Sequence, residues 1–172
     1  MKYIRLLWFD LKNGYFKYPF AYVSAIIIAV SGSLEVHRLS MIWEKKISAI
    51  DYWLYFYGGM KEYIPIAGNA FEFPSMWMLV FLVGAFITLY YPTRDLQKMG
   101  MHILVSAQNR KKWWISKCIW NILITLAYHG CIMLIVFGVS KFFDDTWSGK
   151  LNPTFASSVF GMGTTEFPGM LY

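Results

Sequence analysis

Residues 74–91 read PSMWMLVFLVGAFITLYY, a run without a single charged residue. A helix needs about 20 predominantly apolar residues to cross the hydrocarbon core of a bilayer, so this run predicts a transmembrane helix. Pro74 is typical of a first helical turn, and Pro92, directly after the run, predicts where the helix stops. The whole chain agrees, because 57% of its 172 residues are hydrophobic and only 15% are charged. The composition therefore predicts an all-α integral membrane protein.

Two more apolar runs, residues 18–36 and 119–140, predict two further transmembrane helices. The first run carries a small residue at every fourth position, a pattern that lets another helix approach closely. These helix-packing candidates are Ala21, Ala25, Ala29 and Ser33. A chance recurrence in an alanine-rich helix is the alternative. The last run contains His129, which is either a functional residue or a hydrogen-bonding partner of a neighbouring helix.

The connection at residues 37–73 is too polar to cross a membrane. Within it, Ser48 and Asp51 have the spacing of a capping box, with Asp in place of the usual Glu or Gln. They predict the start of a short amphipathic helix, which Gly58 and Gly59 would end. Such a helix is too short to span the bilayer, so we expect it to lie on the extracellular leaflet. An aromatic platform that contacts cargo is the alternative.

The distribution of charge predicts the topology. Residues 92–118 contain six Lys and Arg against one acid, Asp95, and cytoplasmic loops carry such an excess. Residues 1–17 mix basic and aromatic side chains, as in an amphipathic helix lying in the inner interface. We therefore expect a multi-pass protein of the plasma (cytoplasmic) membrane, of bacterial type, with a cytoplasmic N-terminus and an extracellular C-terminal segment at 141–172. The net charge of +6 then belongs to loops and not to nucleic-acid binding.

Motifs of soluble enzyme chemistry are absent. The sequence has no GxxxxGK[ST] phosphate loop, no CxxC or HExxH metal spacing and no GxSxG elbow. We therefore predict no catalytic, cofactor-binding or metal-binding residue and no enzyme activity in this chain. Cys118 and Cys131 would lie about 20 Å apart on one helix, too far for a disulfide. Both are expected to be small buried hydrophobic residues.

The basic connection also contains an ordered series between the second and third apolar runs. Its members are Asp95, Gly100, Leu104, Ser106, Arg110 and Lys117. The series resembles the inner loop of ABC transporter type-2 permeases, in which a short coupling helix leads into the third span. The N-terminal helix likewise resembles that family's elbow helix. Members of the family commonly have six spans, so the chain would be an N-terminal half or a subunit that assembles with others.

The resemblance implies a permease subunit of an ATP-driven ABC exporter. Its partners would be a cytoplasmic ABC ATPase subunit carrying ATP and Mg²⁺, a second permease half or copy, and membrane lipid. A coupling helix from Asp95 to Ser106 would present an apolar stripe to a groove in the ATPase. The predicted docking residues are Asp95, Leu96, Met99, Gly100, Ile103, Leu104, Ser106, Arg110 and Lys117. The alternatives are a loop held to the membrane by lipid charge alone, and a non-transporting scaffold or immunity subunit that binds another membrane complex.

Overall fold

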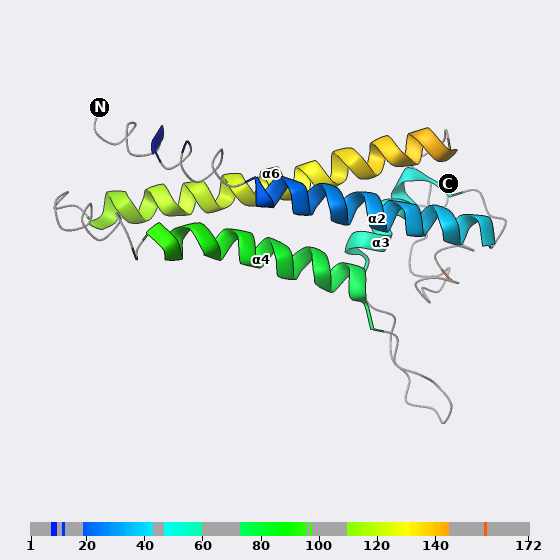
Figure 1. The fold of residues 1–172 in the computed structure, drawn as a ribbon, viewed down its shortest axis with the longest axis horizontal. Coiled ribbons are helices and arrows are strands. Elements are labelled where there is room, and N and C mark those ends of the chain that lie inside the picture. The colour runs from blue at the N-terminus through cyan, green and yellow to red at the C-terminus, as the bar shows by residue number, and fades with distance from the viewer. Residues whose placement is uncertain are drawn as a thin grey trace, which may run out of the picture. The chain divides into compact units, whose positions relative to one another are not determined.

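Four labelled helices lie in the part of the chain that the structure describes (Figure 1). The computed structural model describes residues 8–9, 12, 19–42, 47–59, 73–95, 97, 110–144 and 157. In chain order, the helices are α2 (Phe20–Ile42), α3 (Ala49–Tyr57), α4 (Ser75–Asp95) and α6 (Arg110–Asp144). No strand occurs within these described ranges. The predicted all-helical fold is confirmed for this part of the chain.

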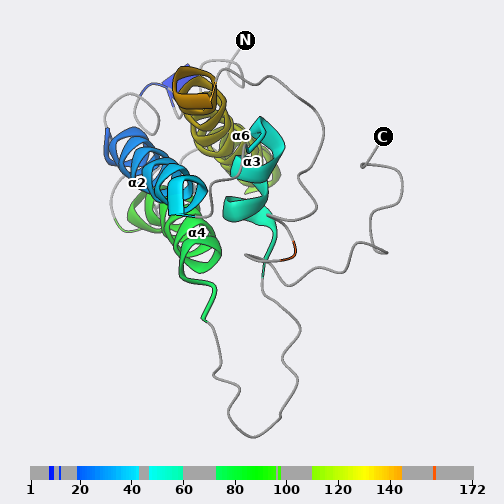
Figure 2. The ribbon, with the colours of Figure 1, turned by 90° about the vertical axis from the view of Figure 1, so that its right-hand side faces the viewer.

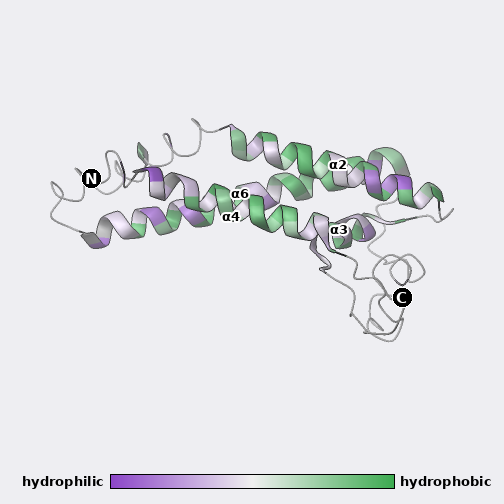
Figure 3. Cartoon of the chain, turned by 60° about the horizontal axis from the view of Figure 1, so that its bottom comes forward, coloured by the Kyte–Doolittle hydropathy of each residue, from purple (hydrophilic) through white to green (hydrophobic). Residues whose placement is uncertain are grey.

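Three of the helices are long and apolar enough to cross a membrane. The candidate spans are Phe20–Ile42, Ser75–Arg94 and Trp113–Phe143. Figure 3 shows hydrophobic residues over most of α4 and the beginning of α2, with hydrophilic residues toward the end of α2 and at the start of α6. This pattern is consistent with a protein embedded in a membrane, as the three apolar runs predicted.

The chain divides into two compact units. Unit 1 comprises Met1–Ala25 and Phe81–Cys131, and unit 2 comprises Ile26–Val80 and Ile132–Tyr172. Each of the three long helices therefore contributes one part to each unit.

Helix α4 continues through the proline that was expected to end it. It runs to Asp95 with Pro92 inside its last turn, so the predicted stop is wrong. A proline removes one backbone hydrogen bond, but its fixed φ of about −65° is a helical value, so the last turn of α4 can continue through it. The Thr93 hydroxyl also donates a hydrogen bond to the Leu89 carbonyl at 2.7 Å. The carbonyl that Pro92 leaves without its usual helical donor is that of Thr88, so the Thr93 bond reinforces the last turn and does not replace the lost one.

The other two long helices also exceed their predicted bounds. Helix α2 runs past residue 36 to Ile42 and includes Glu35 and Arg38. These two residues form an ion pair with 2.6 Å between Arg38 Nη2 and Glu35 Oε1, and this i,i+3 pair allows the helix to continue through charged residues. Helix α6 already begins at Arg110. Residues 110–118, predicted as part of a loop, are therefore helical.

The short helix α3 of unit 2 begins and ends as its sequence predicted. The Ser48 backbone N–H donates a hydrogen bond to Asp51 Oδ2 at 2.8 Å, and the Ser48 hydroxyl donates to the same oxygen at 3.0 Å. The helix ends at Tyr57, and the N–H of the capping residue Gly58 donates to the Leu54 carbonyl at 2.6 Å. Gly59 follows with a φ of 81°, a conformation that favours glycine. The capping pair and the glycine stop are confirmed.

Helix α3 packs against α2 through the Phe56 ring. Tyr52 and Phe56 are completely buried. A Cβ built at Gly32 of α2 would collide with the Phe56 ring and would lie 3.3 Å from the Met76 methyl carbon. The end-on view of Figure 2 shows α3 beside the later part of α2. Because the buried Phe56 ring packs on α2, protein contacts hold α3 in place. Its extracellular location stays a prediction.

Several predicted segments fall outside the described residues. The interfacial helix at 1–17 is described only at Trp8, Phe9 and Lys12, which does not define it. Of the C-terminal segment at 141–172, residues 141–144 belong to α6, and beyond them only residue 157 is described. The coupling helix falls almost entirely within 96–109, where only Gln97 is described.

Candidate docking site at the basic end of unit 1

The site lies where α4 ends and α6 begins. We define the basic end of unit 1 as residues 90–97, at the end of α4, and residues 110–121, at the start of α6. The two helices have these ends on the same side of the fold in Figure 1. The predicted docking connection joins them in the sequence.

On the α4 side, an arginine lies over a tyrosine. Arg94 Nη1 donates a hydrogen bond to the Tyr90 hydroxyl at 3.2 Å, and the guanidinium carbon lies 5.9 Å from the centre of the Tyr90 ring. A cation over an aromatic face is attracted by the ring quadrupole. Both residues are one turn apart on α4, so the contact fixes the guanidinium close to the helix surface.

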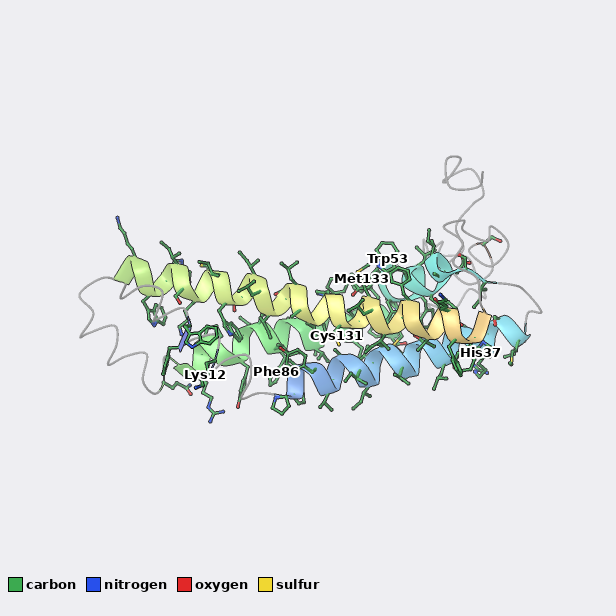
Figure 4. The ribbon with its side chains drawn as sticks, turned by 90° about the horizontal axis from the view of Figure 1, so that it is seen from above. Lys12, His37, Trp53, Phe86, Cys131 and Met133 are labelled. Carbon is green, nitrogen blue, oxygen red and sulfur yellow. The ribbon has the colours of Figure 1, made fainter. Side chains whose placement is uncertain are left out.

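An open groove follows the same face of α4. It has a volume of about 480 Å³. Its lining residues are Phe86, Leu89, Tyr90, Thr93, Arg94 and Gln97. The Phe86 ring projects from α4 toward the start of α2 (Figure 4), where the Phe20 ring meets it edge-on with 6.2 Å between ring centres. The groove is apolar where it begins and polar where it ends.

On the α6 side, a lysine is buried against a tryptophan. Lys117 is only 3% exposed, and its Nζ lies 5.7 Å from the centre of the Trp113 ring. Trp113 is also buried, whereas its neighbour Trp114 is exposed. The Nε1 of Trp113 and the Oδ1 of Asn121 are buried without a hydrogen-bond partner within the described part of the chain. Buried polar atoms of this kind are normally hydrogen-bonded, so this face of α6 has capacity for further polar contacts.

The structure places few of the predicted docking residues. Asp95, expected to open the coupling helix, is the last residue of α4, because α4 continues through Pro92. Arg110 opens α6, and Lys117 points into unit 1 instead of lying on a loop surface. The side chains of Asp95 and Arg110 are outside the described part of the structure. The remaining docking residues are outside it altogether: Leu96, Met99, Gly100, Ile103, Leu104 and Ser106.

The small-residue stripe of α2 is on a buried face. All four of its members are buried: Ala21, Ala25, Ala29 and Ser33. Gly32, next to this stripe, supplies the contact with Phe56 described above. The position of the stripe agrees with a packing role, while its use in close association with another subunit stays a prediction.

His129 lies among aromatic rings of unit 1. Its ring centre is 5.9 Å from that of Phe81 and 5.1 Å from that of Tyr128. A Cβ built at Gly84 would lie 3.9 Å from His129 Nε2 and 3.2 Å from the Tyr128 ring, so the glycine makes room for both side chains. No group of three His, Cys, Asp or Glu residues suited to a metal ion occurs among the residues that the structure describes.

The two cysteines differ from each other. Both are free, but Cys118 is exposed and Cys131 is only partly buried. The prediction that both are buried is wrong for Cys118. This residue lies on the outward side of α6, next in sequence to the inward-pointing Lys117.

Sequence reasoning missed the two cation–aromatic pairs. Tyr90 and Arg94, and likewise Trp113 and Lys117, are four residues apart, the spacing at which helical side chains meet. That spacing is a usable signal only when the segment is known to be helical. Because residues 92–118 were interpreted as a loop, the pairs were not predicted.

Comparison of the chain with protein-family models, with curated proteins and with solved structures found no match. The class of the protein therefore follows from the fold alone: a helical chain with three helices long and apolar enough to span a membrane.

Proposed function

We propose that the chain is the membrane permease subunit, or the N-terminal half of the permease, of an ATP-driven exporter. A separate cytoplasmic ATPase subunit would bind ATP and Mg²⁺ and dock at the basic end of unit 1. The observation that carries the proposal is the series of six cations against one acid in residues 92–118, between two membrane-length helices. A cytoplasmic location of this connection follows from the same excess.

The cation–aromatic contacts support a docking role for the connection. The Arg94 and Lys117 contacts hold one side chain on each helix near the two ends of the connection. The residues between them are covalently continuous with α4 and α6, so a displacement of the connection by a partner acts directly on both helices. Closure of the ATPase subunits would drive this displacement, and the tilt of the helices would move the substrate.

Copurification tests the proposal. The tagged full-length chain is extracted in mild detergent from its native membrane, and the eluate is assayed for ATP hydrolysis and for nucleotide-binding subunits. We expect an ATPase with the intact chain and its loss with Leu104→Asp. The matched control is Leu151→Asp, in the segment predicted on the other side of the membrane, which should retain the ATPase. Absence of an ATPase with the intact chain, or equal recovery with both variants, would overturn the proposal.

The second candidate function is a non-transporting scaffold or immunity subunit. A specific observation favours it: Trp53 of α3 is 38% exposed and stacks on Tyr57, with 5.5 Å between ring centres. Figure 4 labels Trp53 on this short helix. Exposed aromatic residues are enriched in protein interfaces. If Trp53→Ala releases a copurifying membrane complex while Leu104→Asp does not, the scaffold function replaces the exporter.

A further inference from the structure

A glycine lies near the middle of the longest candidate span. Gly130 belongs to Trp113–Phe143 of α6, with several helical turns before it and several after it. Glycine in a helix interior is less favourable than alanine by about 1 kcal/mol. A glycine at this position therefore needs an explanation other than helix stability.

Packing against a neighbouring helix does not explain Gly130. Gly32 of α2 and Gly84 of α4 each make room for an aromatic ring of another helix. A Cβ built at Gly130 meets no atom within 4 Å in the described part of the chain. Gly138 has equally open surroundings, but it lies close to the C-terminal end of α6, where a bend would move only the last turns. Gly130 thus differs from the other helical glycines in combining open surroundings with a central position.

A threonine weakens the same stretch of α6. The Thr125 hydroxyl donates a hydrogen bond to the Asn121 carbonyl at 2.8 Å. In a regular α-helix this carbonyl is also the acceptor of the Thr125 backbone N–H. Such sharing slightly destabilises a helix and often bends it. Thr125 and Gly130 are about 7.5 Å apart along the helix axis, so both act on neighbouring turns.

The division of the chain into two units falls directly after this stretch. The boundary crosses α6 between Cys131, labelled in Figure 4, and Ile132. Before the boundary, α6 packs closely on Gly84 of α4. After the boundary, Phe143 of α6 stacks on His37 of α2, with 4.3 Å between ring centres. Each part of α6 therefore has a contact of its own with another helix.

We propose that residues 125–131 form a hinge at which α6 bends, with a first arm at 110–124 and a second arm at 132–144. The first arm is covalently continuous with the basic connection. A displacement of the connection can therefore change the tilt of the first arm while the second arm keeps its contact with α2. The hinge does not depend on the proposed exporter function, because it requires only that α6 spans a bilayer. The competing explanation is that Gly130 lets a helix of another molecule approach closely.

The distance between two spin labels measures the bend. Both native cysteines of the full-length chain are replaced by alanine, and labels are attached through Ile115→Cys and Met133→Cys, at exposed positions of α6. These positions are about five helical turns apart, so the labels lie on one face at about 27 Å along the axis. A bend of about 20° changes the distance between two points about 6 Å from the axis on that face by about 2 Å. Pulsed electron paramagnetic resonance in phosphatidylcholine nanodiscs gives the distribution of distances.

Two substitutions should straighten the helix. Gly130→Ala adds helix propensity without a collision, and it should narrow the distance distribution by about 2 Å. Thr125→Val removes the hydroxyl that shares the Asn121 carbonyl, and it should narrow the distribution independently of the glycine. The control pair of labels, at Lys111→Cys and Ile122→Cys, lies wholly within the first arm. Its distribution should be the same with and without Gly130→Ala.

Three results would overturn the hinge. The first is an unchanged distribution between positions 115 and 133 in both Gly130→Ala and Thr125→Val. The second is equal narrowing for the control pair, since the whole helix would then have become more rigid. The third is a loss of self-association in Gly130→Ala, measured by crosslinking in the nanodiscs, with an unchanged distance distribution. That result would assign the glycine to a contact with another molecule.

Discussion

Addition of one methyl group at Gly32 tests the packing of α3 on α2. A Cβ at this position would lie 2.6 Å from Phe56 Cε1 and closer still to Cζ, distances at which something must shift. Phe56 has no exposed surface through which to escape. Overpacking of this kind costs about 1–3 kcal/mol. Alanine is a better helix former than glycine by about 1 kcal/mol, so the expected net loss for Gly32→Ala is up to about 2 kcal/mol.

A second helical glycine allows the free-energy cost of the collision to be separated from the effect of helix propensity. A Cβ built at Gly138 of α6 meets no atom within 4 Å. Gly138→Ala therefore benefits from the higher helix propensity of alanine without a collision, and it should be neutral or stabilising by up to about 1 kcal/mol. The difference between the two variants measures the collision alone.

The assay is reversible unfolding of the purified chain in mixed micelles, followed by circular dichroism. A double-mutant cycle adds Phe56→Leu, whose smaller side chain leaves room for the new methyl group. Gly32→Ala should therefore be less costly in the Phe56→Leu background, with a coupling energy of about 0.5–3 kcal/mol. Equal stability of Gly32→Ala and Gly138→Ala, or additive effects of Gly32→Ala and Phe56→Leu, would refute the packing described for α3.

Three other predictions concern α3 and the ends of α6. Asp51→Ala should destabilise α3 by more than the roughly 1 kcal/mol typical of a lost cap, because the Ser48 N–H loses its acceptor. Hydrogen exchange of the α3 backbone amides measures this loss and should become faster. Unchanged exchange would contradict the prediction. Burial raises the pKa of the Tyr57 hydroxyl from 10.0 to about 12. The contribution of the protonated side chain to the free energy of unfolding is therefore fully present below pH 10 and is lost as the pH rises through 12. Tyr57→Phe should remove a late step from the phenolate absorbance titration, and an unchanged titration curve would argue against the raised pKa. In a chain without native cysteines, a membrane-impermeant maleimide should label Lys141→Cys in intact cells and Lys111→Cys only after permeabilisation; the reverse pattern would invert the topology.

Local chemistry made the helices predictable. The apolar runs indicated three long helices because helix formation satisfies the backbone wherever water is excluded. The Ser48–Asp51 pair indicated the start of α3 because its contacts lie within one helical turn. Such features depend only on residues close in sequence.

Long-range contacts and competing local rules account for what was missed. Pro92 is a common signal for a helix end, but its fixed φ is a helical value, and α4 continues through it to Asp95. The collision between Gly32 and Phe56 joins residues far apart in the chain, so no periodicity reveals it. The inward direction of Lys117 follows from the early start of α6, which the basic composition of this segment obscured. The coupling-helix residues from Leu96 to Ser106 remain predicted from sequence, with only Gln97 among them described.

Helix α6 has a further consequence for the membrane that contains it. Its candidate span, Trp113–Phe143, has 31 residues. Within it, Lys117 and Lys141 bound an uncharged stretch at 118–140, whose 23 residues measure about 35 Å at 1.5 Å per residue, against about 30 Å of hydrocarbon in a typical bilayer. Hydrophobic mismatch of this size is relieved by tilting the helix or by thickening the surrounding lipid, each at a cost in free energy. Bilayer thickness is therefore expected to influence where in a cell's membranes this protein accumulates.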